Sequence, residues 1–216
     1  MLCLVVDRRA SLHRLPELVE ESIAAGVDWL QIRERELDTR SLLSWSRALI
    51  SAAQRAGQRV GREVKVVVNR RLDLALALDA DGVHLGFDAL GVPDARALLG
   101  DRAWIGVSAH RPEEVHAARR AGASYAQLAP IYAPLSKRST RPALGLEPLR
   151  MACKAGLPVL AQGGVEASRC AALLAAGAAG VAVTGAISMA DDPQAATRAL
   201  RSALDAAGAS GSASHG

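Results

Sequence analysis

The feature that most constrains the fold of this chain is a regular alternation of short apolar runs with longer segments of helical periodicity. Eight runs have the length and composition of buried strands, at residues 2–6, 29–33, 64–68, 82–85, 104–107, 125–128, 158–161 and 180–183. Eight strands that alternate with helices within 216 residues predict an α/β fold, a single (β/α)₈ TIM barrel. A doubly wound open sheet is the alternative, although it usually has fewer strands.

Helical segments are predicted between the runs, and several of them end in Ala-Gly just before the next strand. Glycine closes a helix well because it readily adopts the left-handed backbone conformation. The clearest helical segments are residues 15–25, 38–56, 112–121, 147–155, 167–176 and 193–206. We expect residues 1–208 to form the barrel and residues 209–216, which are small and polar, to form a disordered tail.

The composition favours a globular protein with a small anionic ligand. Half of the residues are hydrophobic, only 3% are aromatic, and the net charge is +4. The 26 Lys and Arg residues are scattered along the chain and stacking residues are few, so a nucleic-acid partner is not expected. Charged residues or glycine interrupt each apolar run before about 18 residues, which predicts no membrane span. Met1 leads directly into the first run without a basic segment or cleavage site, so we expect a cytoplasmic protein.

The cysteines and the small aliphatic stretches give little functional information. Cys3, Cys153 and Cys170 are odd in number and lack the spacing of a metal site, so they are predicted to be buried thiols. Residues 171–175 are small and aliphatic, which fits either core packing or a contact between the subunits of a homo-oligomer.

Two strand ends near the C-terminus open into glycines just before a helical segment. The first carries Gly163 and Gly164, and the second carries Thr184 and Gly185. Backbone N–H groups at such strand ends are well placed to bind an anion. The two ends therefore predict a phosphate site.

Polar side chains follow the other strands, where the chemistry of a barrel is expected. Gln31, Arg33 and Arg35 alternate along the second strand end, so they share one face and are predicted to point into one mouth. The alternative is that residues 33–36 form a solvated charge run. The later strand ends add Asn69, Arg70, His84, Asp88, Ser108 and His110.

The loop after the sixth strand and the two histidines each allow two interpretations. Lys137 either folds over a bound phosphate or is a surface lysine. His84 and His110 lie at neighbouring strand ends and suit general acid/base catalysis near neutral pH, but each also fits a buried structural role.

The residues at these strand ends resemble, in order, the thiamine phosphate synthase family, which is closely related to the thiazole tautomerases. The resemblance spans residues 2–206 and is carried by segments 31–35, 68–75, 81–86, 105–110 and 129–137 and by the two glycine motifs. It implies a (β/α)₈ barrel that joins hydroxymethylpyrimidine diphosphate to thiazole phosphate and releases pyrophosphate. Small phosphorylated heterocycles are therefore the implied partners.

The resemblance also implies a role for each matching residue. Gln31, Arg33 and Arg35 would meet the diphosphate, with Arg35 standing where the family usually has lysine. Asn69 would bind the pyrimidine side. The remaining implied contacts are Ser108 and Lys137 to pyrophosphate, Ser136 in place of a usual threonine, and Gly164, Thr184 and Gly185 to the thiazole phosphate.

Two positions depart from the family, and at both the resemblance implies an aspartate that binds Mg²⁺. Arg70 stands at the first position and Ala89 at the second. Mg²⁺ requires oxygen ligands, and at an effective dielectric constant of about 20 two like charges about 4 Å apart cost about 4 kcal/mol. Three interpretations stay open: Asp88 supplies a metal ligand from the adjacent position, Asp88 caps the loop, or Arg70 replaces the ion and binds phosphate directly.

These departures leave three functions open, of which a synthase-like transferase is the first expectation. The tautomerase branch also tends to lack the metal aspartates, and the resemblance implies that it aromatises a carboxythiazole phosphate. Its acid/base histidine falls at Pro130 in this chain, and proline cannot transfer a proton. A non-catalytic binder of thiazole or thiamine phosphates is the third alternative.

Overall fold

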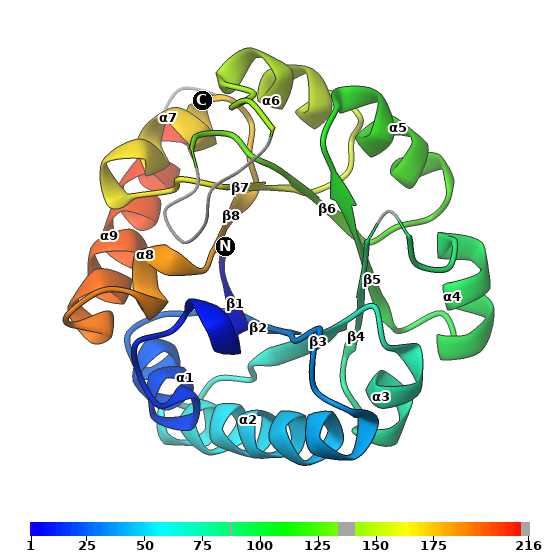
Figure 1. Cartoon of the computed structure of the whole chain (residues 1–216). Coiled ribbons are helices and arrows are strands. Elements are labelled where there is room, and N and C mark those ends of the chain that lie inside the picture. The colour runs from blue at the N-terminus through cyan, green and yellow to red at the C-terminus, as the bar shows by residue number, and fades with distance from the viewer. Residues whose placement is uncertain (87, 134–140, 213–216) are drawn as a thin grey trace.

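The fold is a closed barrel of eight parallel strands, in which each strand pairs with its sequence neighbours and β1 pairs with β8 (Figure 1). The computed structural model describes residues 1–86, 88–133 and 141–212. The strands are β1 (Leu2–Asp7), β2 (Trp29–Arg33), β3 (Lys65–Asn69), β4 (Gly82–Leu85), β5 (Trp104–Ala109), β6 (Tyr125–Leu128), β7 (Val159–Gln162) and β8 (Gly180–Val183). The prediction of a single (β/α)₈ barrel is confirmed.

Helices surround the barrel and cover the outer face of its sheet (Figure 1). They are α1 (Leu15–Ala24), α2 (Thr39–Arg59), α3 (Leu72–Ala77), α4 (Val92–Leu99), α5 (Pro112–Arg120), α6 (Leu146–Cys153), α7 (Cys170–Ala175), α8 (Gly185–Ser188) and α9 (Pro193–Ser212), with short 3-10 turns η1 (Arg8–Ala10) and η2 (Ala167–Arg169). Within α7, Leu173 is fully buried, whereas Ala171, Ala172 and Ala175 are exposed, so core packing explains only part of the small aliphatic stretch. Among the described helices, none combines the length and the apolar character that a membrane span requires.

The C-terminal helix extends further than its composition indicates. Helix α9 continues through Ser212, so residues 209–212 are helical where a disordered tail is expected. Alanine has the highest helix propensity of the residues, and the alanine-rich end of α9 allows the helix to continue through Gly208. The last four residues, 213–216, lie outside the described residues.

Aromatic side chains fill the interior of the barrel beneath its carboxyl end. The ring centroids of Trp29 and Trp104 lie 4.9 Å apart in an edge-to-face arrangement, and Trp29 and Tyr125 lie 4.8 Å apart. Cys3, Val5, Leu160 and Ala182 complete this buried cluster. Edge-to-face and offset arrangements are the favoured geometries of aromatic pairs. Three of the six aromatic residues of the chain, Trp29, Trp104 and Tyr125, thus form a floor beneath the polar mouth.

Gly106 leaves room for the ring of Tyr125 because it has no side chain, and replacement of Gly106 tests this packing. A Cβ atom at Gly106 would lie 2.1 Å from Cζ of Tyr125 on the neighbouring strand. We expect Gly106→Ala to lower the free energy of unfolding by about 2–3 kcal/mol through overpacking. The matched control is Gly208→Ala on the exposed side of α9, where the Cβ meets no described atom within 4 Å. The control is expected to raise stability by about 0.5–1 kcal/mol. Urea unfolding measures both changes, and equal effects would contradict the proposed packing.

Candidate active site

A chain of buried amide side chains crosses the barrel just above the aromatic floor. Nε2 of Gln127 donates to Oε1 of Gln31 at 2.6 Å, and Nε2 of Gln31 donates to Oδ1 of Asn69 at 3.3 Å. Sequence analysis identified Gln31 and Asn69 but missed Gln127. The alternation of side chains along a strand could have indicated Gln127, because it follows the inward-facing Tyr125 by two residues and therefore points into the same interior.

His84 lies deeper than its sequence position indicates. The imidazole is 1% exposed, with Nε2 at 2.9 Å from Oγ of Ser108 and Nδ1 at 3.2 Å from the hydroxyl of Tyr125. Burial, with a smaller contribution from the charge of Arg33, lowers the pKa of His84 to about 3. The prediction of His84 as a general acid or base is therefore corrected, because a neutral, buried ring that is bonded on both nitrogens positions Ser108 instead of reaching a ligand.

The buried state of His84 predicts a specific loss of stability in acid. Histidine has a pKa near 6.5 in the unfolded chain, so as the pH falls the unfolded state takes up this proton before the folded state does. The contribution of neutral His84 to the free energy of unfolding is complete above about pH 6.5. It decreases as the pH falls from about 6.5 to about 3. Near pH 5 the loss amounts to about 2 kcal/mol.

We expect His84→Gln, which does not titrate, to lose about 2 kcal/mol less stability than the parent protein between about pH 7 and about pH 5. Urea unfolding at the two pH values measures the difference, and the other titrating groups cancel in the comparison. An identical pH dependence in the two proteins would show that His84 is not held neutral by the fold.

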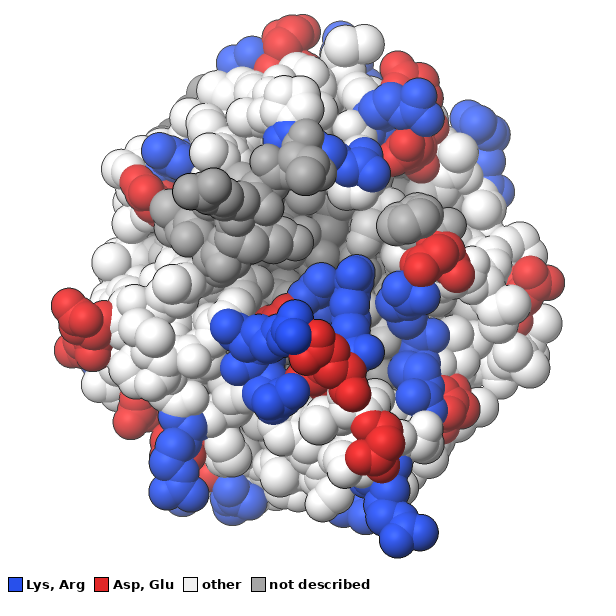
Figure 2. Space-filling view, viewed as in Figure 1, with Lys and Arg blue, Asp and Glu red and all other residues white. Residues whose placement is uncertain are grey.

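Three guanidinium groups converge at the carboxyl ends of β2 and β3. Arg33 forms an ion pair with Asp7, its register partner on β1, and Nη2 of Arg70 lies 2.7 Å from Oδ2 of Asp88. Burial, and then the charges of Arg33 and Arg70, lower the pKa of Arg35. Figure 2 shows Lys and Arg side chains gathered with acidic ones around the centre of this face. Sequence analysis missed Asp7, whose position opposite Arg33 follows only from the register of β1 and β2.

The segment after β2 is held in place and is not a simple solvated charge run. The side chain of Glu34 is 2% exposed, and its Oε1 accepts from the backbone N–H groups of Arg35 at 2.7 Å and Glu36 at 2.8 Å. Its Oε2 accepts from Nε of Arg8 in η1 at 3.0 Å. These contacts fix the backbone that carries Arg35 beside the mouth.

Arg70 has an unusual backbone conformation, with φ of 67° in the left-handed region. This region costs a residue with a side chain roughly 1–2 kcal/mol, and such strain collects at functional sites. The backbone N–H of Arg70 donates to the carbonyl of His84 at 2.9 Å, and the side chain passes beside Gly86 toward Asp88. The turn therefore directs the guanidinium of Arg70 across the end of β4.

The residues present do not fit the Mg²⁺ site that the family resemblance implies. Asp88 faces the guanidinium of Arg70, and Ala89 has no ligand atom in its side chain. In the part of the chain that the structure describes, no three His, Cys, Asp or Glu side chains are grouped so that they could hold a metal ion. The role of Asp88 as a metal ligand stays a prediction, and its ion pair with Arg70 disfavours that role because the carboxylate already faces a positive charge.

The glycine turn after β7 lies beside the start of α8, since β7 and β8 are paired neighbours. Gly163 and Gly164 have φ of 93° and 59°, and a Cβ at Gly164 would lie 2.3 Å from the carbonyl oxygen of Ala133. Arg169 donates to the carbonyl of Gly164, and its guanidinium lies 4.5 Å from the ring centroid of Tyr132. The structure thus brings the predicted Gly163, Gly164, Thr184 and Gly185 to one sector of the rim. Arg169 was missed because no local pattern marks it.

The shape of the glycine turn can be tested separately from its backbone strain. Gly164 and Gly61 have similar φ, 59° and 64°, but a Cβ at Gly61 would meet no described atom within 4 Å. We expect Gly61→Ala to cost about 1 kcal/mol from left-handed strain alone. Gly164→Ala is expected to cost about 1–3 kcal/mol more, because the turn must also move away from Ala133. Urea unfolding provides the measurement, and equal losses would show that Gly164 has no steric role.

The remaining predicted residues lie around the loop after β6. Nδ1 of His110 is 2.6 Å from the carbonyl oxygen of Ala129, and its backbone N–H donates to Oε2 of Glu114 at 2.7 Å. His110 therefore holds the first residue of this loop. Ser136 and Lys137 lie outside the described residues.

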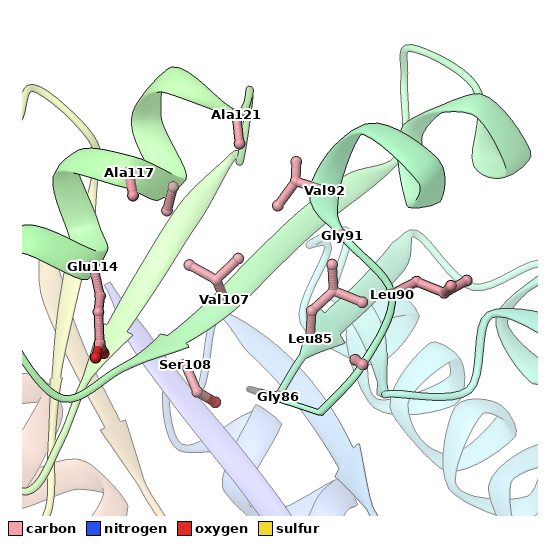
Figure 3. Close-up of a pocket in the computed structure, with 12 residues that line it drawn as sticks. Leu85, Gly86, Leu90, Gly91, Val92, Val107, Ser108, Glu114, Ala117 and Ala121 are labelled. Carbon is pink, nitrogen blue, oxygen red and sulfur yellow. The ribbon is translucent and has the colours of Figure 1, made fainter.

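An apolar cleft of about 310 Å³ lies outside the barrel mouth, between the β4–α4 and β5–α5 units. Figure 3 shows Leu85, Val92, Val107 and Ala117 lining it, with Ser108 at its lower edge. Among the described residues that line it, the charged one is Glu114, which is acidic. The described residues that line the cleft include no Lys or Arg to bind a phosphate, so the arginine-rich mouth is the better candidate for an anionic ligand.

The fold is that of a (β/α)₈ barrel protein, and arginine side chains and a glycine turn lie at the carboxyl ends of its strands. A family model described as thiamine monophosphate synthase matches residues 2–187. The chain is 38% identical over 205 residues to a thiamine-phosphate synthase of Roseiflexus sp. (strain RS-1), covering 94% of this chain and 84% of that protein. It is 42% identical over 193 residues to a thiamine-phosphate synthase of Natronomonas pharaonis, covering 88% and 87%.

Structural comparison agrees with the sequence comparison. A thiamine phosphate pyrophosphorylase from Pyrococcus furiosus superposes with a TM-score of 0.83 at 28% identity, covering 95% of this chain and 96% of that one. The chain belongs to the thiamine monophosphate synthase family.

Proposed function

We propose that this protein is a thiamine-phosphate synthase that joins hydroxymethylpyrimidine diphosphate to thiazole phosphate and releases pyrophosphate. The observation that carries the proposal is that one rim has an arginine-rich sector and a separate glycine turn, each of which suits an anion. Arg33, Arg35 and Arg70 lie on the β2–β3 side, and the glycine turn lies at β7–β8 across the closed barrel. One sector suits a diphosphate and the other a monophosphate, as this pair of substrates requires. The names of the relatives agree with this assignment.

The chemistry of the reaction requires positive charge near the leaving group, which Arg33, Arg35 and Arg70 would supply. The bond between the pyrimidine methylene carbon and the diphosphate oxygen breaks, and its electron pair leaves with pyrophosphate. The lone pair of the thiazole nitrogen then forms the new bond to the methylene carbon. Negative charge builds up on the leaving group, so preorganised guanidinium groups stabilise the transition state more than the bound substrate.

We assign the other residues by their positions around these two sectors. Ser108, held by His84, contacts the leaving pyrophosphate, and Gln31 and Asn69 meet the diphosphate and the pyrimidine side. Gly163, Gly164, Thr184 and Gly185 bind the thiazole phosphate through backbone N–H groups and the threonine hydroxyl. Ser136 and Lys137 are proposed to contact pyrophosphate from the loop after β6. We also propose that the protein acts in the cytoplasm, as a monomer or a homo-oligomer, without a nucleic-acid partner.

The tautomerase alternative is less well supported by the site. Pro130 occupies the position at which the resemblance implies an acid/base histidine, and proline has no proton to exchange. Two other histidines are candidates to replace it. His84 is buried, with its ring bonded to Ser108 and Tyr125, and His110 is bonded through Nδ1 to the carbonyl oxygen of Ala129. The transferase is therefore the function that the geometry supports best.

Incubation of the purified protein with both substrates tests the proposal. We expect thiamine phosphate and pyrophosphate to form in equal amounts, measured by chromatography and a coupled pyrophosphate assay. Arg33→Ala is expected to lower kcat/KM by about 100-fold, because it removes a charge that faces the leaving group. The matched control is Arg102→Ala, an exposed arginine that precedes β5 at the opposite end of the barrel, with an expected change below about twofold.

The absence of product would contradict the transferase assignment. If the protein bound thiazole phosphate without making product, the non-catalytic binder would be the correct function. Conversion of a carboxythiazole phosphate to its aromatic isomer would instead establish the tautomerase.

A further inference from the structure

We propose that this site binds diphosphate without a divalent cation, because the guanidinium of Arg70 supplies the positive charge at the place where a metal ion is implied. The inference rests on the proposed function and specifies how that site holds its diphosphate. It follows from the disagreement between the implied Mg²⁺ site and the side chains that are present.

Arg70 is fixed in position by its surroundings. Its backbone is held in the left-handed region, and its N–H donates to the carbonyl of His84 on β4 at 2.9 Å. Its side chain lies against Gly86, where an added Cβ would be 3.8 Å from Cδ of Arg70, and ends at Asp88. The turn fixes where the side chain of Arg70 begins and in which direction it leaves the backbone, so a phosphate that replaces Asp88 meets a guanidinium already directed toward it.

The described ion pairs leave the arginines at the mouth with an excess of positive charge. Arg33, Arg35 and Arg70 provide three positive charges, and the carboxylates that pair with them are Asp7 and Asp88. Burial lowers the pKa of Arg35, and the positive charges of Arg33 and Arg70 lower it further. A divalent cation entering this region would be repelled, whereas a diphosphate would relieve the repulsion and accept paired hydrogen bonds from the guanidinium groups.

Asp88 affects diphosphate binding in opposite directions in a site without metal and in a metal site. Its side chain is 41% exposed, and exposed ion pairs contribute little to stability, so a phosphate group can displace it from Arg70. In a site without metal, Asp88 only opposes an incoming anion. In a metal site, Asp88 would be a required ligand. Removal of its charge therefore strengthens diphosphate binding in the first case and abolishes it in the second.

The test is calorimetric titration of the full-length protein with inorganic pyrophosphate, in EDTA and in excess Mg²⁺. We expect binding in EDTA, and Asp88→Asn is expected to strengthen it about threefold. Arg70→Asn is expected to weaken it by about tenfold or more, since it removes a charge-assisted contact. Asparagine tolerates the left-handed backbone, so this variant keeps the conformation of the turn.

Two matched variants control for the general effect of charge. Asp101→Asn removes a negative charge, as Asp88→Asn does, and Arg102→Ala removes a positive charge, as Arg70→Asn does. Both control residues are exposed and precede β5 at the opposite end of the barrel. We expect each to change pyrophosphate affinity by less than about twofold. Circular dichroism on every variant confirms that the barrel is intact.

The inference is overturned if pyrophosphate binds only in the presence of Mg²⁺, or if Asp88→Asn loses binding. Assays of thiamine phosphate formation on the same samples separate this result from a failure of the proposed function. Formation of thiamine phosphate in EDTA supports both the metal-free site and the transferase. Binding in EDTA without product supports the metal-free site and contradicts the transferase, whereas product that requires Mg²⁺ supports the transferase and contradicts the metal-free site.

Discussion

Hydrogen bonding between β1 and β8 closes the sheet, and the site depends on this closure. Residues 2–4 pair with residues 181–183, and the backbone N–H of Val181 donates to the carbonyl of Met1 at 2.9 Å. Gly180 permits the contact, since a Cβ there would lie 2.1 Å from the same carbonyl oxygen. Because the ring is closed, the arginine sector and the glycine turn belong to one rim. In an open sheet they would lie at distant positions, and no single substrate pair would span them.

The interior below the rim changes from apolar to polar over a short distance along the strands. The aromatic floor excludes water, and the amides of Gln31, Asn69 and Gln127 satisfy one another directly above it. His84 joins the two layers, because its neutral ring bonds to Tyr125 below and Ser108 above. A neutral, hydrogen-bonded layer of this kind allows three arginines to stand at the mouth without burying an unpaired charge in the core.

The local patterns of the sequence were sufficient for the barrel and for much of its rim. The periodicity located all eight strands, with β3 and β7 displaced by one residue and β1 and β5 ending later than predicted, and the glycine motifs marked the turns at the ends of β7 and β8. Asp7, Gln127 and Arg169 were missed because their roles depend on register or on contacts between distant segments. The depth of His84 was likewise not predictable, since it depends on the packing of Trp29, Trp104 and Tyr125. The expected helix at residues 167–176 divides into η2 and α7.

The central claim is that positive side chains and backbone amides on one rim hold both phosphorylated groups. A crystal structure of the protein grown with thiamine phosphate and pyrophosphate in the presence of EDTA tests it most directly. We predict pyrophosphate in contact with Arg33, Arg35 and Arg70, and the phosphate group of thiamine phosphate at Gly164 and Gly185. Pyrophosphate bound elsewhere, or a parallel crystal with Mg²⁺ in which the ion joins Asp88 to pyrophosphate, would contradict it.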